Sequence, residues 1–278
     1  MEIKTKKIAI RFYEELNDFL PKERREKRFT HNFIDRTSVK DLIESLGVPH
    51  TEVDLIMVNG NSVKFNYIIN DGDDISVYPV FESLDISDVQ HLRAKPLRKP
   101  KFICDVHLGT LARNLRMFGI DSYYKNNLND EEIVKISLAE KRTILTRDIG
   151  ILKRAEVTHG YFIRNDNPEK QISDVILRFS LIKLIKPFTL CLECGSKLVR
   201  ISKKKILHLI PQNVRNEHNK FLNCINCKKI FWTGTHFNSM IKFINETIER
   251  INSWHQLLII IFFYSEILMI QKFYLKTY

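Results

Sequence analysis

The sequence predicts three consecutive parts: an N-terminal α+β domain, a central α/β domain with a parallel sheet, and a small C-terminal segment held together by a metal ion. Three observations support this multi-domain division: alternating apolar residues at the start, alternating strand and helix patterns in the middle, and two C-x-x-C pairs after residue 190. With 278 residues, the chain is long enough for several cores. We expect the parts at 1–82, 101–187 and 188–250, a linker at 83–100 and an apolar tail at 251–278.

The N-terminal part has the pattern of a β-grasp domain. Ile8, Ile10 and Phe12 alternate with polar residues, as in a half-buried strand, and a second strand is expected near 28–32. Ser38 precedes a helix with one apolar face, which we expect to end at Gly47. Further strands are expected at 55–58, which is followed by the hairpin signal Asn59-Gly60, and at 75–78.

The linker at 83–100 contains two prolines and several basic side chains. Its basic half is a candidate contact for a phosphate backbone. A solvated tether is the alternative explanation.

The central part alternates short apolar runs with helical patterns, which is typical of a parallel sheet. Strands are expected at 102–104, 122–124, 143–146 and 160–163. Helices are expected over 108–118, from an N-cap at Asp130 with Ile133, Ile136 and Leu138 on the buried face, and from Pro168 with an inner face of Ile172, Val175, Ile176, Phe179 and Ile182.

Three acidic residues lie where predicted strands end or where the helix between them begins. Asp105 ends the first strand, Asp148 follows the third, and Asp130 begins the helix between them. The carboxyl ends of parallel strands converge on one crevice, where a divalent cation would relieve repulsion between carboxylates. Mg²⁺ or Mn²⁺ bound there indicates a phosphodiesterase, with Asp105, Asp130 and Asp148 as metal ligands and catalytic residues. Glu131 and Glu132 are alternatives to Asp130, and a helix cap also explains that residue.

The formal charge of +11 favours a polyanionic partner, and nucleic acid is the first one to consider. The candidate RNA-binding residues are Arg113 and Arg116, which lie off the apolar stripe of their helix, Arg147, and the run Lys203, Lys204 and Lys205. A solvated surface is the alternative explanation for each of them.

Four of the five cysteines have the spacing of a structural zinc site. Cys191 and Cys194 form one C-x-x-C pair, and Cys224 and Cys227 form the other. Four thiolates in this arrangement suit tetrahedral Zn²⁺, which would stabilise a segment too small to fold alone. Cys104 lies inside a predicted strand and is expected in the core.

The cysteine usage indicates a reducing compartment, and the first residues lack the long apolar core of a signal peptide. We therefore expect a cytoplasmic protein. The apolar run 257–264 is short for a membrane span, which needs roughly 20 residues, so a packed helix or an association surface is expected there instead of a membrane anchor.

Several sequence segments also resemble a known protein family. The segments CDVHLGTLARNLRMFGIDSYY, NDEEIV and ILTRDIGIL resemble the Mut7-C RNase domain, a PIN-like nuclease fold. KKIFWTGTHFNSMIKFI, with Trp232 and His236, resembles the closing motif of its zinc-ribbon region. EVDLIMVNG and DGDDISVYPVFESLD resemble the ubiquitin-like domain that precedes it. The resemblance implies a ribonuclease for single-stranded RNA that uses Mg²⁺ or Mn²⁺, with Asp105, Asp130 and Asp148 at the family's acidic positions. Stacking on a base and packing against the ribbon both remain open for Trp232.

Two other functions remain open at this point. In one, the protein binds RNA or the ribosome without cleaving it, although unmetallated carboxylates would repel phosphate. In the other, the N-terminal domain assists sulfur transfer, which the missing free Gly-Gly end disfavours. An intramolecular role or a protein partner is the expectation for the ubiquitin-like domain. Oligomeric state and RNA target are not defined by the sequence.

Overall fold

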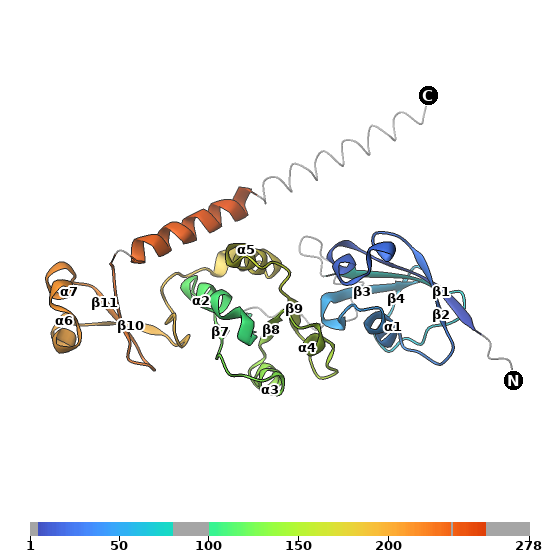
Figure 1. The fold of residues 1–278 in the computed structure, drawn as a ribbon, viewed down its shortest axis with the longest axis horizontal. Coiled ribbons are helices and arrows are strands. Elements are labelled where there is room, and N and C mark those ends of the chain that lie inside the picture. The colour runs from blue at the N-terminus through green and yellow to red at the C-terminus, as the bar shows by residue number, and fades with distance from the viewer. Residues whose placement is uncertain (1–4, 80–99, 235, 254–278) are drawn as a thin grey trace, which may run out of the picture. The chain divides into compact units, whose positions relative to one another are not determined.

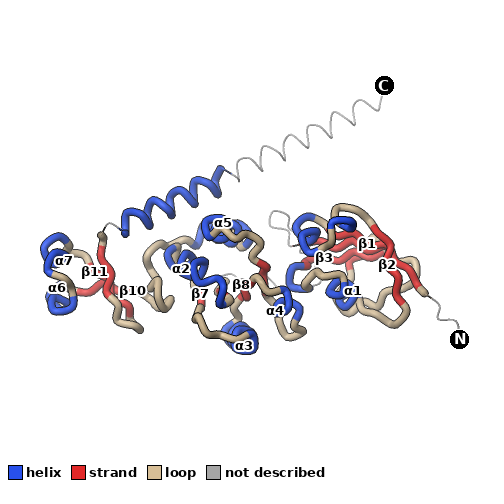
Figure 2. The backbone as a smooth tube through the Cα atoms, in the orientation of Figure 1, coloured by secondary structure: helices blue, strands red, loops and turns tan. Residues whose placement is uncertain are grey.

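The computed structural model describes residues 5–79, 100–234 and 236–253, which belong to two compact units. The first consists of Met1–Ala112 and Ser122–Arg164, and the second of Arg113–Asp121 and Asn165–Tyr278. Figure 1 labels the helices and strands, and Figure 2 distinguishes them from the connecting loops by colour.

The first unit begins with a mixed five-stranded sheet in the order β2-β1-β5-β3-β4. Its strands are β1 (Lys6–Phe12), β2 (Phe29–Phe33), β3 (Val53–Val58), β4 (Asn61–Ser62) and β5 (Asp74–Pro79). Strands β1 and β5 pair in parallel, whereas the other neighbouring pairs are antiparallel. This arrangement confirms the expected β-grasp domain.

One α-helix packs against this sheet. Helix α1 (Val39–Ser45) begins where the Ser38 side chain accepts a hydrogen bond from the Asp41 N–H, and Gly47 follows it with a φ of +107°. The core joins apolar residues of α1 with those of the strands and of the short 3₁₀ helix η1 (Glu14–Phe19). Two further 3₁₀ helices, η2 (Lys22–Arg24) and η3 (His50–Glu52), complete this part of the chain. The alternation seen in β1 therefore has its expected cause, because Ile8, Ile10 and Phe12 are buried.

The second sheet of this unit is parallel throughout and has the order β7-β6-β8-β9. Its strands are β6 (Phe102–Cys104), β7 (Ser122–Tyr123), β8 (Thr143–Thr146) and β9 (Gly160–Phe162). The connecting helices are η4 (Val106–Leu108), α2 (Gly109–Met117), α3 (Asp130–Glu140) and α4 (Ile149–Lys153). Apolar residues of β6, β8, α3 and α4 form its core, and Cys104 is fully buried in β6. The expected parallel α/β domain is confirmed.

The second unit contains α5 (Pro168–Arg178), η5 (Leu181–Leu184) and a three-stranded antiparallel sheet. The sheet strands are β10 (Leu198–Ile201), β11 (Phe221–Cys224) and β12 (Ile230–Trp232), and a helix occupies 236–253. Between β10 and β11 the chain forms α6 (Lys203–Ile206), η6 (Leu207–Leu209) and α7 (Gln212–Glu217), which supply a small apolar core of their own.

Three details of the expected helices are wrong. The N-cap of α3 is Asn129, and Asp130 is the first helical residue. Leu138 is 48% exposed, because the buried face of α3 uses Val134 instead. Helix α5 ends at Arg178, so Phe179 is its C-cap and is followed by the separate η5.

Two expectations concern residues outside the described part of the chain. These are the linker, apart from Pro100, and the tail from residue 254 onward, including the apolar run 257–264. Among the described helices, none combines the length and the apolar character that crossing a membrane requires.

Candidate active site and metal centre

The carboxyl edge of the parallel sheet brings together polar residues that are distant in sequence. Asp105 directly follows β6, and Arg147 and Asp148 follow β8. Helix α3 begins at Asp130 after the connection from β7. Because parallel strands end at the same edge, the topology assigns all four residues to that edge.

Thr146, the last residue of β8, holds Asp105 in place. The register pairs Cys104 with Leu145, so Asp105 and Thr146 are next to each other across the two strands. The Thr146 hydroxyl donates a 2.7 Å hydrogen bond to Oδ2 of Asp105 and accepts a 2.8 Å hydrogen bond from the Asp148 N–H. Thr146 is fully buried and Asp105 is 5% exposed. One buried hydroxyl thus connects one candidate metal ligand to the backbone of the other.

The remaining oxygen of Asp105 has no hydrogen-bond partner within the described ranges. Asp105 occupies the N-cap position of η4, yet its side chain makes no capping hydrogen bond there. The carboxylate therefore keeps Oδ1 available for a ligand that comes from outside the protein.

Asp148 caps helix α4 with one of its two oxygens. Oδ1 accepts a 2.6 Å hydrogen bond from the Gly150 N–H, and the side chain is exposed. A Cβ at position 150 would approach this oxygen to 3.0 Å, so glycine permits the close turn. The second oxygen is left for solvent or a cation.

Asp130 has a looser place in the site. The capping box of α3 is formed by Asn129 and Glu132, with hydrogen bonds of 2.9 and 3.0 Å between side chain and backbone in each direction. The helix-cap explanation for Asp130 is therefore wrong, and Glu132 uses its carboxylate in the cap. Within the described residues, Thr146 connects Asp105 with Asp148, and no comparable link reaches Asp130.

The chemistry of Asp105 and Asp148 fits a magnesium-type ion. Both side chains offer a carboxylate oxygen with no protein hydrogen bond in the described part of the chain, and Mg²⁺ prefers oxygen ligands. Such ions are commonly bound by one or two carboxylates and retain several waters. A closed cage of three carboxylates is therefore not required, and the three aspartates do not form one among the described residues.

The second candidate metal centre is formed by the two C-x-x-C pairs. The four sulfurs of Cys191, Cys194, Cys224 and Cys227 lie within 4.8 Å of one another. The Sγ atoms of Cys191 and Cys227 are 3.6 Å apart, and those of Cys194 and Cys224 are 3.4 Å apart. Tetrahedral zinc with bonds of about 2.3 Å requires sulfur separations of roughly 3.8 Å, so a small expansion would admit the ion.

Two matching backbone turns present these sulfurs. The Gly195 N–H donates to the Cys191 carbonyl over 2.8 Å, and the Lys228 N–H donates to the Cys224 carbonyl over 3.2 Å. Both donor residues have positive φ, of +74° and +61°. Glycine adopts this conformation without strain, which explains Gly195 directly after the first pair.

The thiols also have the pKa pattern of a crowded sulfur cluster. Burial raises the pKa of Cys191 to about 12. Burial also opposes ionisation of Cys194, but hydrogen bonds from the side chain and backbone of Ser196 and from the Cys224 thiol lower its pKa to about 6. Zinc binds thiolates, so binding of the ion would displace the thiol protons.

The structure separates the candidate RNA-binding arginines into two kinds. Arg113 is exposed, and its guanidinium is 3.9 Å from the Glu193 carboxylate. Arg116 is only 2% exposed and donates hydrogen bonds to the carbonyls of Leu192 and Glu193 over 3.2 and 2.6 Å. The expectation that Arg116 faces a polyanion is therefore wrong, because its guanidinium holds the first cysteine turn. Arg147 is exposed at the carboxyl edge.

The three consecutive lysines lie on α6, not in an irregular loop. Lys203 donates a 2.9 Å hydrogen bond to the side chain of Asn219, whereas Lys204 and Lys205 are exposed. These two side chains thus present positive charge to solvent.

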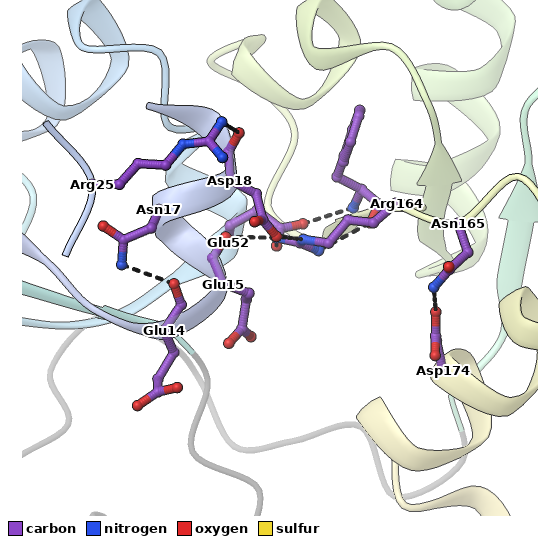
Figure 3. A network of polar contacts seen from close by, with 10 residues as sticks. Glu14, Glu15, Asn17, Asp18, Arg25, Glu52, Arg164, Asn165 and Asp174 are labelled. Atoms are coloured by element: carbon purple, nitrogen blue, oxygen red, sulfur yellow. Dashed lines mark hydrogen bonds and ion pairs between the residues drawn. The ribbon is translucent and has the colours of Figure 1, made fainter. Parts of the chain in front are cut away.

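A polar contact that no sequence pattern predicts connects the two domains of the first unit. Figure 3 shows Glu52 of the β-grasp domain meeting Arg164, which follows β9. Glu52 is completely buried. One of its oxygens accepts a 2.7 Å hydrogen bond from the Phe162 N–H, and the other forms a 3.0 Å ion pair with Arg164. Arg164 also donates to Asp18 over 3.0 Å. Burial opposes the charge of Arg164, but Glu52, Tyr161 and Glu15 together outweigh burial and raise the arginine pKa.

This contact covers the outer edge of β9. The Ile163 N–H bonds to the Thr146 carbonyl, so alternation directs the Phe162 N–H away from β8, toward Glu52. The neighbouring His50 bonds to the Val157 carbonyl over 2.8 Å, and Lys153 bonds to the Glu44 carbonyl over 2.8 Å. The β-grasp domain therefore closes an open sheet edge.

The fold and these sites define a multidomain protein in which a β-grasp domain, a parallel α/β domain and a ribbon with four clustered cysteines occur in one chain. Comparison with protein families matches residues 100–244 to the Mut7-C RNAse domain and residues 5–85 to Mut7-C ubiquitin. The first match covers just over half of the chain, so the chain belongs to the Mut7-C RNAse domain family. No curated protein matches, and no solved structure does either.

Proposed function

We propose that this protein is a metal-dependent ribonuclease that hydrolyses phosphodiester bonds in single-stranded RNA. The observation that supports this proposal best is the pair Asp105 and Asp148, joined through the Thr146 hydroxyl at the carboxyl edge of the parallel sheet. Membership of the Mut7-C RNAse domain family supports a nuclease function, and the central domain would correspond to the PIN-like fold.

Each residue of the site has a defined task in this proposal. Asp105 and Asp148 hold the Mg²⁺ or Mn²⁺, and Asp130 contributes as a third carboxylate at the same edge. The bound ion supplies Lewis acidity and makes a water nucleophilic at neutral pH. The buried hydrogen bond from Thr146 orients Asp105, as hydrogen bonds from neighbouring residues orient the ligands of metal ions. Arg147 neutralises phosphate charge beside this pair.

The remaining parts supply stability and RNA contacts. The four cysteines hold a structural Zn²⁺, and Arg113 together with the lysines of α6 contact the phosphate backbone. The ubiquitin-like domain covers the edge of β9 in the nuclease domain. Its outer surface binds a protein partner. We propose the boundaries 1–82, 101–187 and 188–250 for these three parts.

The decisive experiment is a cleavage assay with labelled single-stranded RNA and either Mg²⁺ or Mn²⁺. Asp105→Asn and Asp148→Asn should each lower cleavage by orders of magnitude, because a charge is lost without a change in volume. Asp35→Asn, at an exposed position of the β-grasp domain, is the matched control and should cleave like wild type. Equal activity of all three variants in a preparation free of contaminating nuclease would sink the assignment.

A second candidate is a protein of the same fold that binds RNA without cleaving it. The observation that favours it is the lack of a three-carboxylate cluster among the described residues. The same assay separates the two functions, since this candidate requires RNA binding with no metal-dependent cleavage by the wild-type protein.

A further inference from the structure

One face of the three-stranded ribbon sheet carries an aromatic ring, a guanidinium and aliphatic side chains. The register pairs Arg200 with Leu222, and Leu222 with Phe231. Residues opposite each other in antiparallel strands share a face, and Leu198 joins them two positions before Arg200. This set of four residues is called the ribbon face below.

The opposite face of the same sheet is already covered. Phe221, Ile201 and Ile230 alternate with the residues of the ribbon face and pack against Ile206 and other apolar residues of the α6–α7 insertion. The insertion between β10 and β11 therefore provides a core on one side of the sheet only.

A pocket of about 380 Å³ opens on the ribbon face. Besides the four ribbon-face residues, Phe188 and Phe237 line it, with ring centroids 4.6 Å apart. The volume is within the range of small-molecule sites, which is about 300 to 1,000 Å³. An aromatic and aliphatic surface of this size suits a flat, partly apolar group.

The charged residues at this pocket are both basic. Arg200 and Lys220 line it and are exposed, and in the described part of the chain neither has a carboxylate within ion-pair distance. An apolar peptide would leave both charges unused, whereas a nucleotide places a base on the rings and a phosphate beside the cations. Single strands are bound in this way, through stacking on aromatic side chains and contacts from basic residues.

We propose that the ribbon face binds one base of single-stranded RNA, with the base stacked on Phe231 and the adjoining phosphate held by Arg200. The identity of the ligand rests on the proposed ribonuclease function. The site would anchor the RNA strand independently of the carboxylates, because none of its residues belongs to the cleavage machinery.

The test measures binding of fluorescein-labelled hexauridylate by anisotropy, with full-length Asp105→Asn protein and no added divalent cation. Phe231→Leu should weaken binding by about tenfold, since stacking accounts for roughly 1 to 3 kcal/mol per base, and should leave the salt dependence unchanged. Phe231→Tyr keeps the ring and should bind like the parent. Arg200→Gln should reduce the slope of log affinity against log salt by about 0.7.

Lys27→Gln, an exposed lysine of the β-grasp domain, is the charge-matched control and should leave affinity and slope unchanged. Zinc content near one ion per chain verifies that each ribbon variant is folded. Wild-type affinity and slope in folded Phe231→Leu and Arg200→Gln would overturn the proposal, as would a parent protein that does not bind hexauridylate. Binding is measured without cleavage, so an inactive wild-type enzyme would overturn the proposed function and leave this result valid.

Discussion

At the scale of single residues, Thr146 orients the Asp105 carboxylate and bonds the backbone of Asp148. Its hydroxyl uses its hydrogen for the Asp105 carboxylate and a lone pair for the Asp148 N–H. Asp148 in turn uses one oxygen to begin α4. The orientation of the Asp105 carboxylate therefore depends on a neutral side chain that also bonds the backbone of Asp148.

Substitution of Thr146 tests this dependence. Thr146→Val keeps the shape but removes the hydroxyl, leaving the partly buried Asp148 N–H and the Asp105 carboxylate oxygen unpaired, which should cost about 1 to 3 kcal/mol of unfolding free energy. Cleavage should fall about 10- to 100-fold, as for other groups that orient metal ligands. Chemical denaturation and initial cleavage rates measure the two effects.

Thr146→Ser is the matched control, because it retains the hydroxyl and loses only a methyl group. It should keep most of the activity. Full activity in Thr146→Val, with a normal requirement for Mg²⁺ or Mn²⁺, would show that the hydroxyl does not position Asp105.

At the scale of elements, the β-grasp domain protects strand β9. Exposed edge strands present unpaired N–H groups that attract other strands, and a covering segment is a common solution. Here the segment is η3, whose Glu52 accepts the Phe162 N–H and pairs with Arg164. The Arg164 guanidinium also lies over the Phe19 ring, 5.1 Å from its centroid. The β-grasp domain therefore has a structural role within its own chain.

Removal of the buried carboxylate tests this contact. Glu52→Ala removes the buried partner of the Arg164 charge and leaves the Phe162 N–H unpaired, which should lower the free energy of unfolding by about 3 to 5 kcal/mol. Asp18→Ala removes an exposed partner of the same arginine and should cost at most about 1 kcal/mol. Urea denaturation provides both values.

A double variant refines the comparison. Glu52→Leu with Arg164→Met should be more stable than Glu52→Leu alone, because the double variant has no buried guanidinium that lacks its buried carboxylate. Equal losses from Glu52→Ala and Asp18→Ala would show that the buried pair does not hold the domains together.

Local patterns allowed most elements to be predicted, because their causes lie within a few residues. The alternation in β1 and the cap at Ser38 are examples, and so are the two cysteine pairs. Burial was predicted wrongly where it depends on contacts with residues that are distant in the sequence. Arg116 has the helical phase of a surface residue, but its guanidinium is buried against the carbonyls of the first cysteine turn.

The same limit applies to the candidate site. Asp105 and Asp148 are marked by their positions after strands, whereas the role of Thr146 depends on the register between β6 and β8. Glu52 and Arg164 are separated by 112 residues, and neither has a local pattern that predicts burial. The predicted N-cap of α3, Asp130, lies one residue after the actual N-cap, Asn129, because both are suitable N-cap residues.

At the scale of the whole molecule, the net charge of +11 would attract RNA from any direction, and only local contacts distinguish a binding path from general attraction. Lys204 and Lys205 are exposed on α6 and suit such a path, while Lys203 is bonded to Asn219. A test of the path must therefore remove charge at two positions while keeping the total charge of the compared variants equal.

The double variant Lys204→Ala/Lys205→Ala meets this condition when compared with Lys22→Ala/Lys27→Ala in the β-grasp domain, where both lysines are also exposed. If the lysines of α6 contact phosphates, their removal should reduce the salt slope by about 1.4, which is about 0.7 for each contact to a single strand. The β-grasp variant should keep the wild-type slope. Both variants should still cleave at saturating RNA, since the carboxylates are unchanged. Identical slopes in the two variants would mean that the lysines of α6 act only through the overall charge, and would exclude them from the RNA path.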